Sequence, residues 1–400
     1  MDFNLDSKLE DFRQMVRAAI KEDLPEELTE HARLYGGGTS EPYDTLELAK
    51  VLNKRGWTVP HWPVEHGGTG WSPMELYIFN EELYNAWAPD TCWGATHMCG
   101  PVIYTFGSQY LKDKFLPAFR NGDYYLAQGF SEPSNGSDLA RLRTAARREG
   151  DKYIINGQKI WTSGAWASEW GFFLVRTNPD VKPQAGISFI MVDLKSPGIT
   201  VRRIPQINDE ADLCEVFLDN VEVPAENLVG EEGKGWDYAK FLLDHERTTS
   251  SFIFYNKREL RRVKWLAERE MLDGVPLSQV PSFQQRIART EAEVMALEWS
   301  VMRELAREDF AYNSTAAAST LKIAGSKLQQ SITELAVDVL GMRATRYYPI
   351  EPDERGEFTP LWPDHVPGRT SQALINRAAT IYGGSLQIQK TLIAKLAFGL

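Results

Sequence analysis

The chain has 400 residues, 43% hydrophobic and 25% charged, so it is long enough for two or three domains with large cores. Its formal net charge of −11 argues against nucleic acid as the main partner. No apolar run approaches the ~18 residues of a membrane-spanning helix, and the acidic, amphipathic start is unlike a signal peptide. We therefore expect a cytoplasmic protein without membrane insertion. Its cysteines, Cys92, Cys99 and Cys214, show no metal-type or paired pattern and are expected to be free, buried or half-buried thiols.

Residues 1–120 are predicted to form an N-terminal helical domain. Apolar residues recur at helical spacing from Leu5 to Ile20, and the pattern continues over residues 45–54 and 73–86. Loops rich in Gly, Pro and Trp separate these segments.

Residues 121–230 change character and are predicted to form a β domain. Strands are expected over residues 153–155, 172–176, 187–193, 199–204 and 215–223. Closely spaced strands divided by turn sequences such as KSPG are typical of a barrel or sandwich.

Residues 231–400 return to long helices. They are expected over residues 235–272, 281–311, 315–341 and 370–397, and four such helices fit a bundle. The Pro-rich segment 346–369 lies between the last two helices and is predicted to be a surface loop. The fold class is therefore mainly α with a central β domain.

Two segments of the β domain carry the strongest functional signal. Residues 126–138 (LAQGFSEPSNGSD) are small, polar and turn-forming, as needed to bring backbone N–H groups close to a ring edge or a phosphate. Residues 153–170 (YIINGQKIWTSGAWASEW) carry Trp161 and Ser163 two residues apart on a predicted strand, and therefore on one face. There the indole can stack on a flat ring while the hydroxyl bonds its edge.

These two segments resemble the flavin cradle of the acyl-CoA dehydrogenase family, and the resemblance covers nearly the whole chain. Residues 57–72 (WTVPHWPVEHGGTGWS) and 219–236 (DNVEVPAENLVGEEGKGW) also match stretches typical of the family. The resemblance implies an N-terminal helical domain, a middle β-barrel and a C-terminal four-helix bundle. It implies FAD as the cofactor, lying between the β domain and the bundle.

By this resemblance, residues of both segments contact the flavin ring. Gln128, Phe130 and Ser131 would line the ring, and Ser131 would donate to its pyrimidine edge. Trp161 and Ser163 would cover the ring near N5, the atom that receives hydride. Taken alone, Trp161 would be read as a tryptophan of the barrel core.

The remaining cofactor contacts implied by the resemblance lie further from the ring. Gly136 and Ser137 would meet the pyrophosphate, although Ser137 would also suit a simple turn or helix cap. Ser385 and Gln387 match positions of the last helix on the adenine side.

Dehydrogenating an acyl-CoA requires a desolvated carboxylate that removes the α-proton. Many family members carry it in a Y-E-G-T turn, but here Gly383 stands at that position. Residues 243–247 (LDHER) resemble the other known location of the base, used by the isovaleryl and long-chain members. The resemblance therefore assigns Glu246 as the base and Arg247 as its support. It favours a bulky, branched or long acyl group, including a steroid-derived or dicarboxylic one.

The chain also departs from the family. The R-x-x-F-G arginine, which reaches the flavin diphosphate of a neighbouring subunit, is missing from the region after Arg269. Asp338 stands where the family has a glutamine facing that diphosphate. We therefore expect a tetramer, built either from one chain with altered cofactor contacts or with a paralogous subunit that supplies the arginine.

The leading hypothesis is an FAD-dependent acyl-CoA dehydrogenase that passes electrons to an electron-transfer flavoprotein. Two alternatives stay open. One is an acyl-CoA oxidase-type flavoenzyme that reduces O₂. The other is a catalytically silent structural subunit of a heteromeric acyl-CoA dehydrogenase.

Overall fold

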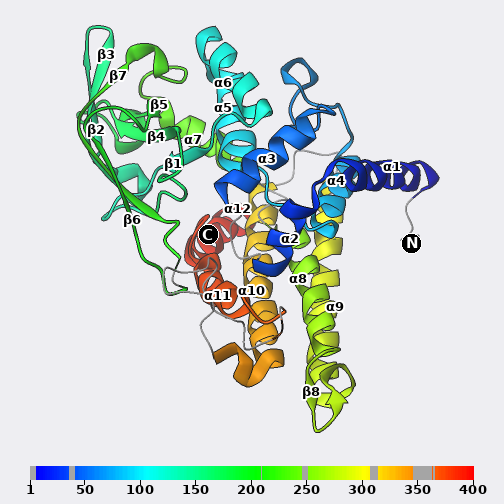
Figure 1. Ribbon diagram of the computed structural model, residues 1–400. Coiled ribbons are helices and arrows are strands. Elements are labelled where there is room, and N and C mark those ends of the chain that lie inside the picture. Colours follow the sequence, from blue (N-terminus) through cyan, green and yellow to red (C-terminus); the bar gives the residue numbers. More distant parts are fainter. Residues whose placement is uncertain are drawn as a thin grey trace, which may run out of the picture.

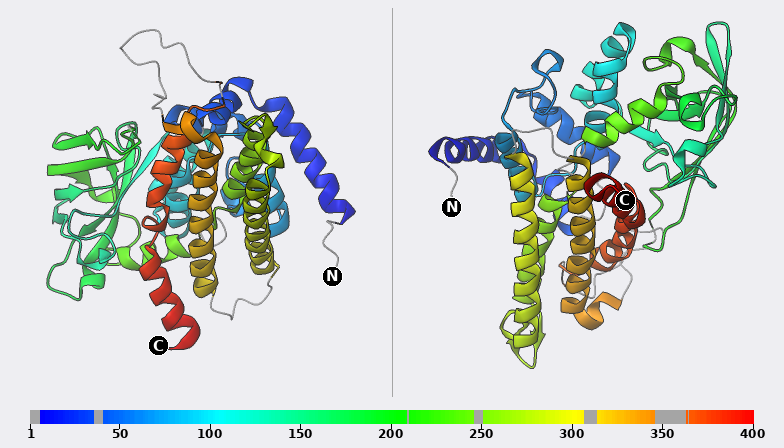
Figure 2. Two further views of the ribbon diagram at one scale, coloured as in Figure 1. Left: turned by 90° about the horizontal axis from the view of Figure 1, so that it is seen from below. Right: turned by 180° about the vertical axis from the view of Figure 1, so that it is seen from behind.

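The computed structural model describes residues 6–35, 41–208, 210–245, 251–306, 314–345, 363 and 365–400. Within them the chain is mainly helical around one central sheet, which confirms the fold class expected from the sequence. The sheet lies at one side of the molecule, and the long C-terminal helices run side by side at the other (Figure 1, Figure 2). No helix in the described ranges is long and apolar enough to cross a bilayer.

The N-terminal part is helical, as predicted. It contains α1 (Ser7–Asp23), α2 (Glu26–Tyr35), α3 (Pro42–Asn53), α4 (Pro73–Asn85), α5 (Gly100–Phe106) and α6 (Gln109–Asn121). Helix α4 begins with a capping box. Ser72 Oγ accepts from the backbone N–H of Glu75 at 3.2 Å, and the Glu75 carboxylate accepts from that of Ser72 at 2.7 Å. Arg13 of α1 donates to Glu81 of α4 at 2.6 Å, which joins the two helices.

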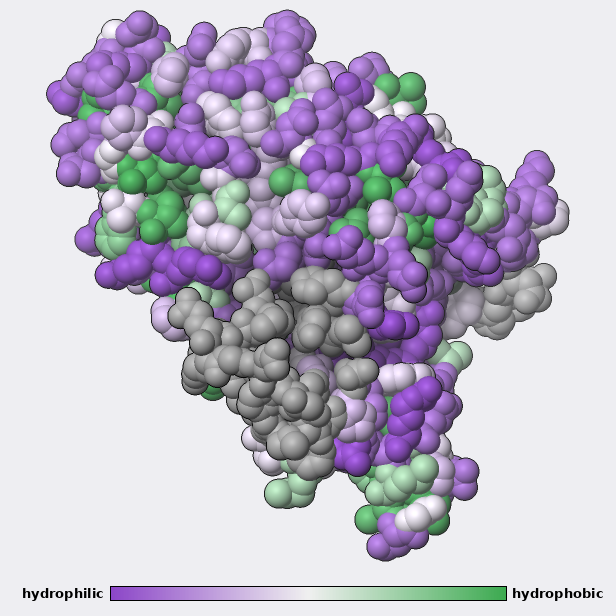
Figure 3. Space-filling model, viewed as in Figure 1, coloured by the Kyte–Doolittle hydropathy of each residue, from purple (hydrophilic) through white to green (hydrophobic). Residues whose placement is uncertain are grey.

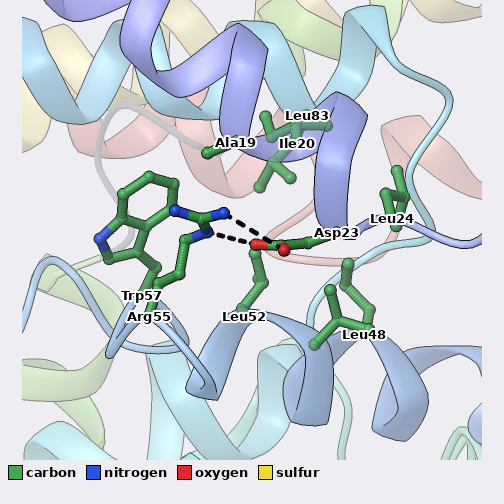
Figure 4. A pocket seen from close by; sticks show the side chains of 10 residues that line it. Ala19, Ile20, Asp23, Leu24, Leu48, Leu52, Arg55, Trp57 and Leu83 are labelled. Atoms are coloured by element: carbon green, nitrogen blue, oxygen red, sulfur yellow. Dashed lines mark hydrogen bonds and ion pairs between the residues drawn. The ribbon is translucent and has the colours of Figure 1, made fainter.

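A small gap remains among α1, α3 and α4. Figure 4 shows apolar side chains such as Ile20, Leu48 and Leu83 around it, and the ion pair of Arg55 with Asp23 at its edge. The gap has a volume of about 10 Å³, which is room for at most one water molecule. It is therefore a packing defect and not a ligand site.

The β domain is one curled sheet. Its strands are β1 (Leu126–Gly129), β2 (Ala145–Glu149), β3 (Lys152–Lys159), β4 (Trp170–Arg176), β5 (Ile187–Asp193), β6 (Ile199–Arg203) and β7 (Cys214–Pro224). The order across the sheet is β1-β4-β2-β3-β7-β6, with β5 paired to β4. The five expected strands are confirmed, whereas β1 and β2 were not expected. All three cysteines are free and buried, as the sequence suggested.

Strand β1 sets the position of the segment that follows it. It pairs in parallel with β4, with Gly129 opposite Phe173. A Cβ at Gly129 would lie 2.4 Å from the Phe173 ring, so only glycine allows this close approach. The Phe173 ring thus packs against the backbone of Gly129, immediately before residues 130–138.

The C-terminal part packs as a helical bundle around α10. Its helices are α7 (Gly235–His245), α8 (Ile253–Ala267), α9 (Pro281–Leu305), α10 (Ser314–Leu340), α11 (Arg369–Ile375) and α12 (Leu386–Phe398). Helix α10 contacts α8, α9, α11 and α12, and its apolar residues join those of α8 and α9 in one core.

Two of the expected helices are wrong in detail. The segment 370–397 is not one helix, because Gly383 and Gly384 adopt left-handed φ values of 62° and 85° between α11 and α12. The segment 235–272 does not stay helical to its end. After α8 the chain forms a hairpin of β8 (Met271–Leu272) and β9 (Val275–Pro276), whose Asp-Gly turn has positive φ at both residues.

The hairpin is also visible on the surface. In Figure 3 hydrophobic side chains gather at the tip that β8 and β9 form, and Met271, Leu272 and Val275 are all exposed.

The segment 346–369 differs from a simple surface loop at its end. Residues 346–362 and 364 lie outside the described part of the chain. Val366 and Arg369 are only 2% and 1% exposed. The surface-loop prediction is therefore wrong for these last residues, because they pack into the bundle.

Candidate functional site

The two sequence segments singled out above lie side by side at one end of the sheet. The backbone N–H of Ile160, just after β3, donates to the carbonyl of Ser131 at 3.0 Å. The next donor is Lys159, whose Nζ donates to the carbonyl of Phe130 at 3.1 Å and to the Glu132 carboxylate at 2.9 Å. These bonds hold the start of the first segment against the end of β3.

Lys159 and Glu132 form a buried ion pair. The lysine side chain is fully buried, and the Glu132 carboxylate also accepts from the backbone N–H groups of Arg143 and Thr144 at 2.6 and 2.8 Å. Burial lowers the pKa of Lys159 to about 8, while Glu132 opposes that shift. Burial alone would raise the pKa of Glu132, but Lys159 and the N–H donors outweigh it and lower the pKa. Both groups are therefore charged at neutral pH.

Trp161 and Ser163 do not lie on a strand, which corrects the prediction from the sequence. Strand β3 ends at Lys159, Trp161 has a left-handed φ of 61°, and residues 163–167 form turns. The reason is tertiary: Thr162 and Gly164 donate backbone N–H bonds to the carbonyls of Cys214 and Asp212, each at 3.0 Å. The alternation that would place both side chains on one face does not apply there.

Both side chains nevertheless face outward. The Trp161 indole is 56% exposed, so it is not the core tryptophan that the simpler reading suggested, and Ser163 is exposed too. A bulky residue in the left-handed region is strained, and such strain concentrates at functional sites. An exposed indole on a strained backbone is available to pack against a ligand.

The first segment turns tightly after Glu132. Glu132 and Asn135 exchange backbone hydrogen bonds of 3.0 and 3.1 Å, and Gly136 and Ser137 then lie exposed. The Asn135 amide Nδ2 is buried and has no hydrogen-bond partner in the described part of the chain. Buried donors in folded proteins are nearly always bonded to protein, to water or to a ligand. The turn therefore fits a polar or anionic group.

The residues predicted to line a flavin ring differ in how far their side chains are buried. Gln128 and Ser131 are half-buried, whereas the Phe130 side chain is buried edge-on against the rings of Phe172 and Phe189. Phe130 thus contributes its side chain to the core and can offer only its backbone to a ligand.

A loop of the β domain connects this site to the bundle. Asp212 accepts from Gly164, while Asn208 donates to Ser371 Oγ of α11 at 3.2 Å. Ser371 in turn donates to Glu210 at 3.2 Å. The loop thus holds the segment after β3 at a fixed place beside α11.

On the bundle side, Lys322 of α10 organises the turn before α12. Its Nζ donates to the carbonyls of Ala379 and Gly384 at 3.1 and 2.8 Å, and burial lowers its pKa to about 8. A side chain at Gly383 would meet no atom of the described residues within 4 Å. The turn therefore leaves open space where many family members carry the base.

Ser385 and Gln387 stand at the start of α12. Ser385 Oγ caps the helix by accepting from the backbone N–H of Ile388 at 3.4 Å, and Gln387 is exposed. Both are accessible for a ligand contact.

The predicted base and its support, Glu246 and Arg247, lie outside the described residues. Three residues that organise the site were missed: Glu132, Lys159 and Lys322. The signal for Lys159 was present, because it follows Tyr153 and Ile155 at even spacing on the buried face of β3.

Comparisons with known proteins give matches along nearly the whole chain. Three family models match the chain: the acyl-CoA dehydrogenase N-terminal domain over residues 6–123, the middle domain over 127–221 and the C-terminal domain over 233–398. The chain is 35% identical to acyl-CoA dehydrogenase IpdE1 of Mycobacterium tuberculosis, over 98% of each chain. It is 32% identical to acyl-CoA dehydrogenase FadE26 of the same organism, over 88% of this chain and 87% of the relative.

Solved structures give the same result. The ChsE4-ChsE5 complex from Mycobacterium tuberculosis contains a chain with a TM-score of 0.82 and 30% identity, covering 100% of this chain and 99% of that one. A steroid acyl-CoA dehydrogenase, Tcur3481-Tcur3483, has a TM-score of 0.84 and 26% identity at the same coverage.

Proposed function

The chain belongs to the acyl-CoA dehydrogenase family, and from this premise we propose that it catalyses the FAD-dependent α,β-dehydrogenation of an acyl-CoA thioester. One observation carries the proposal. The Ile160–Ser131 backbone bond, fixed by the buried Lys159–Glu132 pair, puts polar turn donors and an exposed indole at one end of the sheet.

The residues present fit an FAD molecule. The unpartnered Asn135 amide and the exposed Gly136 and Ser137 suit its pyrophosphate, since backbone and amide donors are what such a group requires. Gln128 and Ser131 suit the ring edge, with Trp161 and Ser163 over the ring, and Ser385 and Gln387 suit the adenine side. When bound, FAD supplies the acceptor for the hydride that leaves the β-carbon.

Glu246 is proposed as the group that removes the α-proton, and Arg247 as its support. The sequence LDHER and the side-chain-free turn at Gly383 support this assignment. Glu246→Gln should retain flavin and ligand while the turnover falls by several orders of magnitude. Asp237→Asn, an exposed acid on α7, is the matched control and should leave the turnover unchanged. A Glu246→Gln enzyme with more than about a tenth of the wild-type kcat, a loss under ~1.4 kcal/mol of barrier, would rule out the assignment.

For the substrate we propose a bulky, ring-bearing acyl group of the steroid-derived kind, because the similar solved structures include one described as a steroid enzyme. A series of acyl-CoAs assayed with an artificial electron acceptor tests this. Faster turnover of short linear acyl-CoAs than of ring-bearing ones would contradict it. An electron-transfer flavoprotein is the proposed acceptor, and H₂O₂ released in stoichiometric amounts would instead identify an oxidase.

We further propose that the chain assembles with a paralogous subunit into a tetramer. Two of the similar solved structures, ChsE4-ChsE5 and Tcur3481-Tcur3483, are named after two chains each, and the exposed apolar β8–β9 tip suits a subunit contact. Asp338 forms an ion pair with Arg286 of α9, so the pair presents no net positive charge to a neighbour's diphosphate. FAD loading should therefore be incomplete when the chain is expressed alone and rise on co-expression with the paralogue. One FAD per chain in a homotetramer would refute this.

A further inference from the structure

A second cavity lies on the helical side of the molecule, among α2, α4 and α8. Its volume is about 550 Å³, within the ~300–1,000 Å³ of small-molecule pockets. Its polar lining is mainly cationic: Arg33, Arg261 and Arg262 face one carboxylate, Glu30. The indoles of Trp87 and Trp265 supply flat apolar walls. None of these residues belongs to the proposed flavin cradle.

Arg262 is the best-buried cation of this cavity, with 7% of its surface exposed. Its Nη1 donates to the carbonyl of Arg33 at 2.5 Å, and its Nε lies 2.9 Å from the Glu259 carboxylate. Its Nη2 is buried and has no hydrogen-bond partner among the described residues. A buried guanidinium donor without an acceptor is costly, so an acceptor arriving from the cavity would be stabilising.

The neighbouring charges do not supply that acceptor. Glu259 is shared among arginines: Arg258 Nε lies at 2.9 Å from its carboxylate and Arg369 Nη1 at 3.8 Å, in addition to Arg262. Asp90 adds one more negative charge near Arg258. Glu259 is thus shared by three arginines, and the Arg262 Nη2 stays without a bond to any described residue.

Arg33 and Arg261 add two more guanidinium groups to the lining. Neither side chain has a hydrogen bond or an ion pair with any residue in the described ranges, and both are exposed at the cavity. Two exposed arginines and a buried one with an unbonded Nη2 therefore line the same cavity, and guanidinium groups are the donors that oxyanions prefer.

The tryptophans define the rest of the ligand. Trp87 adopts a left-handed φ of 59° and holds its ring 4.3 Å from the Arg262 guanidinium carbon. The Arg262 guanidinium covers one face of the indole, and a flat ligand ring can stack against the rest of it while its anionic substituent meets the arginines.

We propose that this cavity binds a small molecule that combines a flat ring with an oxyanion, as a carboxylate or a phosphate ester. The oxyanion occupies the space between Arg261 and Arg262, and the ring lies against Trp87. None of its residues belongs to the proposed flavin cradle or is the proposed base, and the binding test does not depend on turnover.

The test is calorimetric titration of the purified full-length chain with 2-naphthoate and with its neutral counterpart 2-naphthamide. We expect saturable binding of the carboxylate and none of the amide. Arg261→Gln and Arg33→Gln are accessible positions that spare the buried network, and each should weaken 2-naphthoate binding about tenfold, equivalent to about 1.4 kcal/mol. Arg289→Gln, an exposed arginine of α9, is the control and should bind as the wild type does.

The proposal is overturned if 2-naphthoate shows no saturation up to about 10 mM, if the amide binds equally well, or if both arginine variants bind as the wild type. Steady-state kinetics with 2-naphthoate present then show whether the anion in the cavity is part of the acyl-CoA or a separate molecule. If 2-naphthoate raises the KM of the wild type for an acyl-CoA without changing kcat, and does so much less in Arg261→Gln, the site receives the far end of the acyl group. If it binds without changing the KM, the site receives a separate anionic molecule. Either competition result supports the site.

Discussion

Replacing Lys159 with methionine should destabilise the β domain more than a typical substitution. Methionine keeps the apolar volume of the lysine stem but removes the ammonium group. The Glu132 carboxylate then stays buried with two backbone N–H donors and no bonded countercharge, and the carbonyl of Phe130 loses its lysine donor.

The expected loss follows from these contacts. Breaking a buried ion pair by removing one partner costs about 3–5 kcal/mol. The two remaining N–H donors at 2.6 and 2.8 Å place this case at the lower end of that range, near 3 kcal/mol. If the whole chain unfolds as one unit, this corresponds to a fall in Tm of about 4 °C.

The pH dependence separates a lost charge from lost packing. In the wild type the pKa of Glu132 is lowered, because Lys159 and the N–H donors outweigh burial. Without Lys159, burial dominates and the folded-state pKa rises above the unfolded value of about 4.3. The variant then takes up its proton in the folded state as pH falls, so its deficit in unfolding free energy should shrink from pH 7.5 towards pH 5.

Urea unfolding of both proteins at these two pH values measures the effect. Lys152→Met is the matched control, because Lys152 lies on β3 like Lys159 but its ion pair with Glu222 of β7, at 2.6 Å, is open to solvent. This substitution should change the unfolding free energy little. A Lys159→Met deficit below about 1 kcal/mol, or one that is equal at both pH values, would refute the reasoning.

Two further predictions concern Trp161 and Ser163 after β3 and Lys322 of α10. Trp161→Ala should lower the FAD content per chain, measured by visible absorbance, by more than Ser163→Ala does, because the indole offers the larger stacking surface; full loading of both variants would exclude them as flavin contacts. Burial lowers the pKa of Lys322 to about 8, against about 10.4 when unfolded. The unfolded state therefore binds more protons between these pH values, and the unfolding free energy of the wild type should rise with pH across that window. Lys322→Met should reduce the rise, and an unchanged slope would show that Lys322 does not titrate there.

Much of the candidate site could be predicted from the sequence, because its residues cluster in short segments. Residues 126–138 and 153–170 each bring several polar groups together without any tertiary contact, and both segments lie at the site. The turn at Gly383 was also visible as a departure from the family pattern. What the segments could not reveal is which polar residues support them, since Lys159 and Lys322 resemble ordinary charged residues until their burial is known.

The sequence by itself determined the mainly helical fold with its central sheet, because helical periodicity and β-rich runs are properties of neighbouring residues. It did not determine the turn at Trp161, where bonds to Cys214 and Asp212 replace the expected strand. Nor did it indicate the cationic cavity, whose bond from Arg262 to Arg33 joins residues 229 positions apart. Such contacts depend on burial and on partners that only folding brings together, so they cannot be predicted from local sequence patterns.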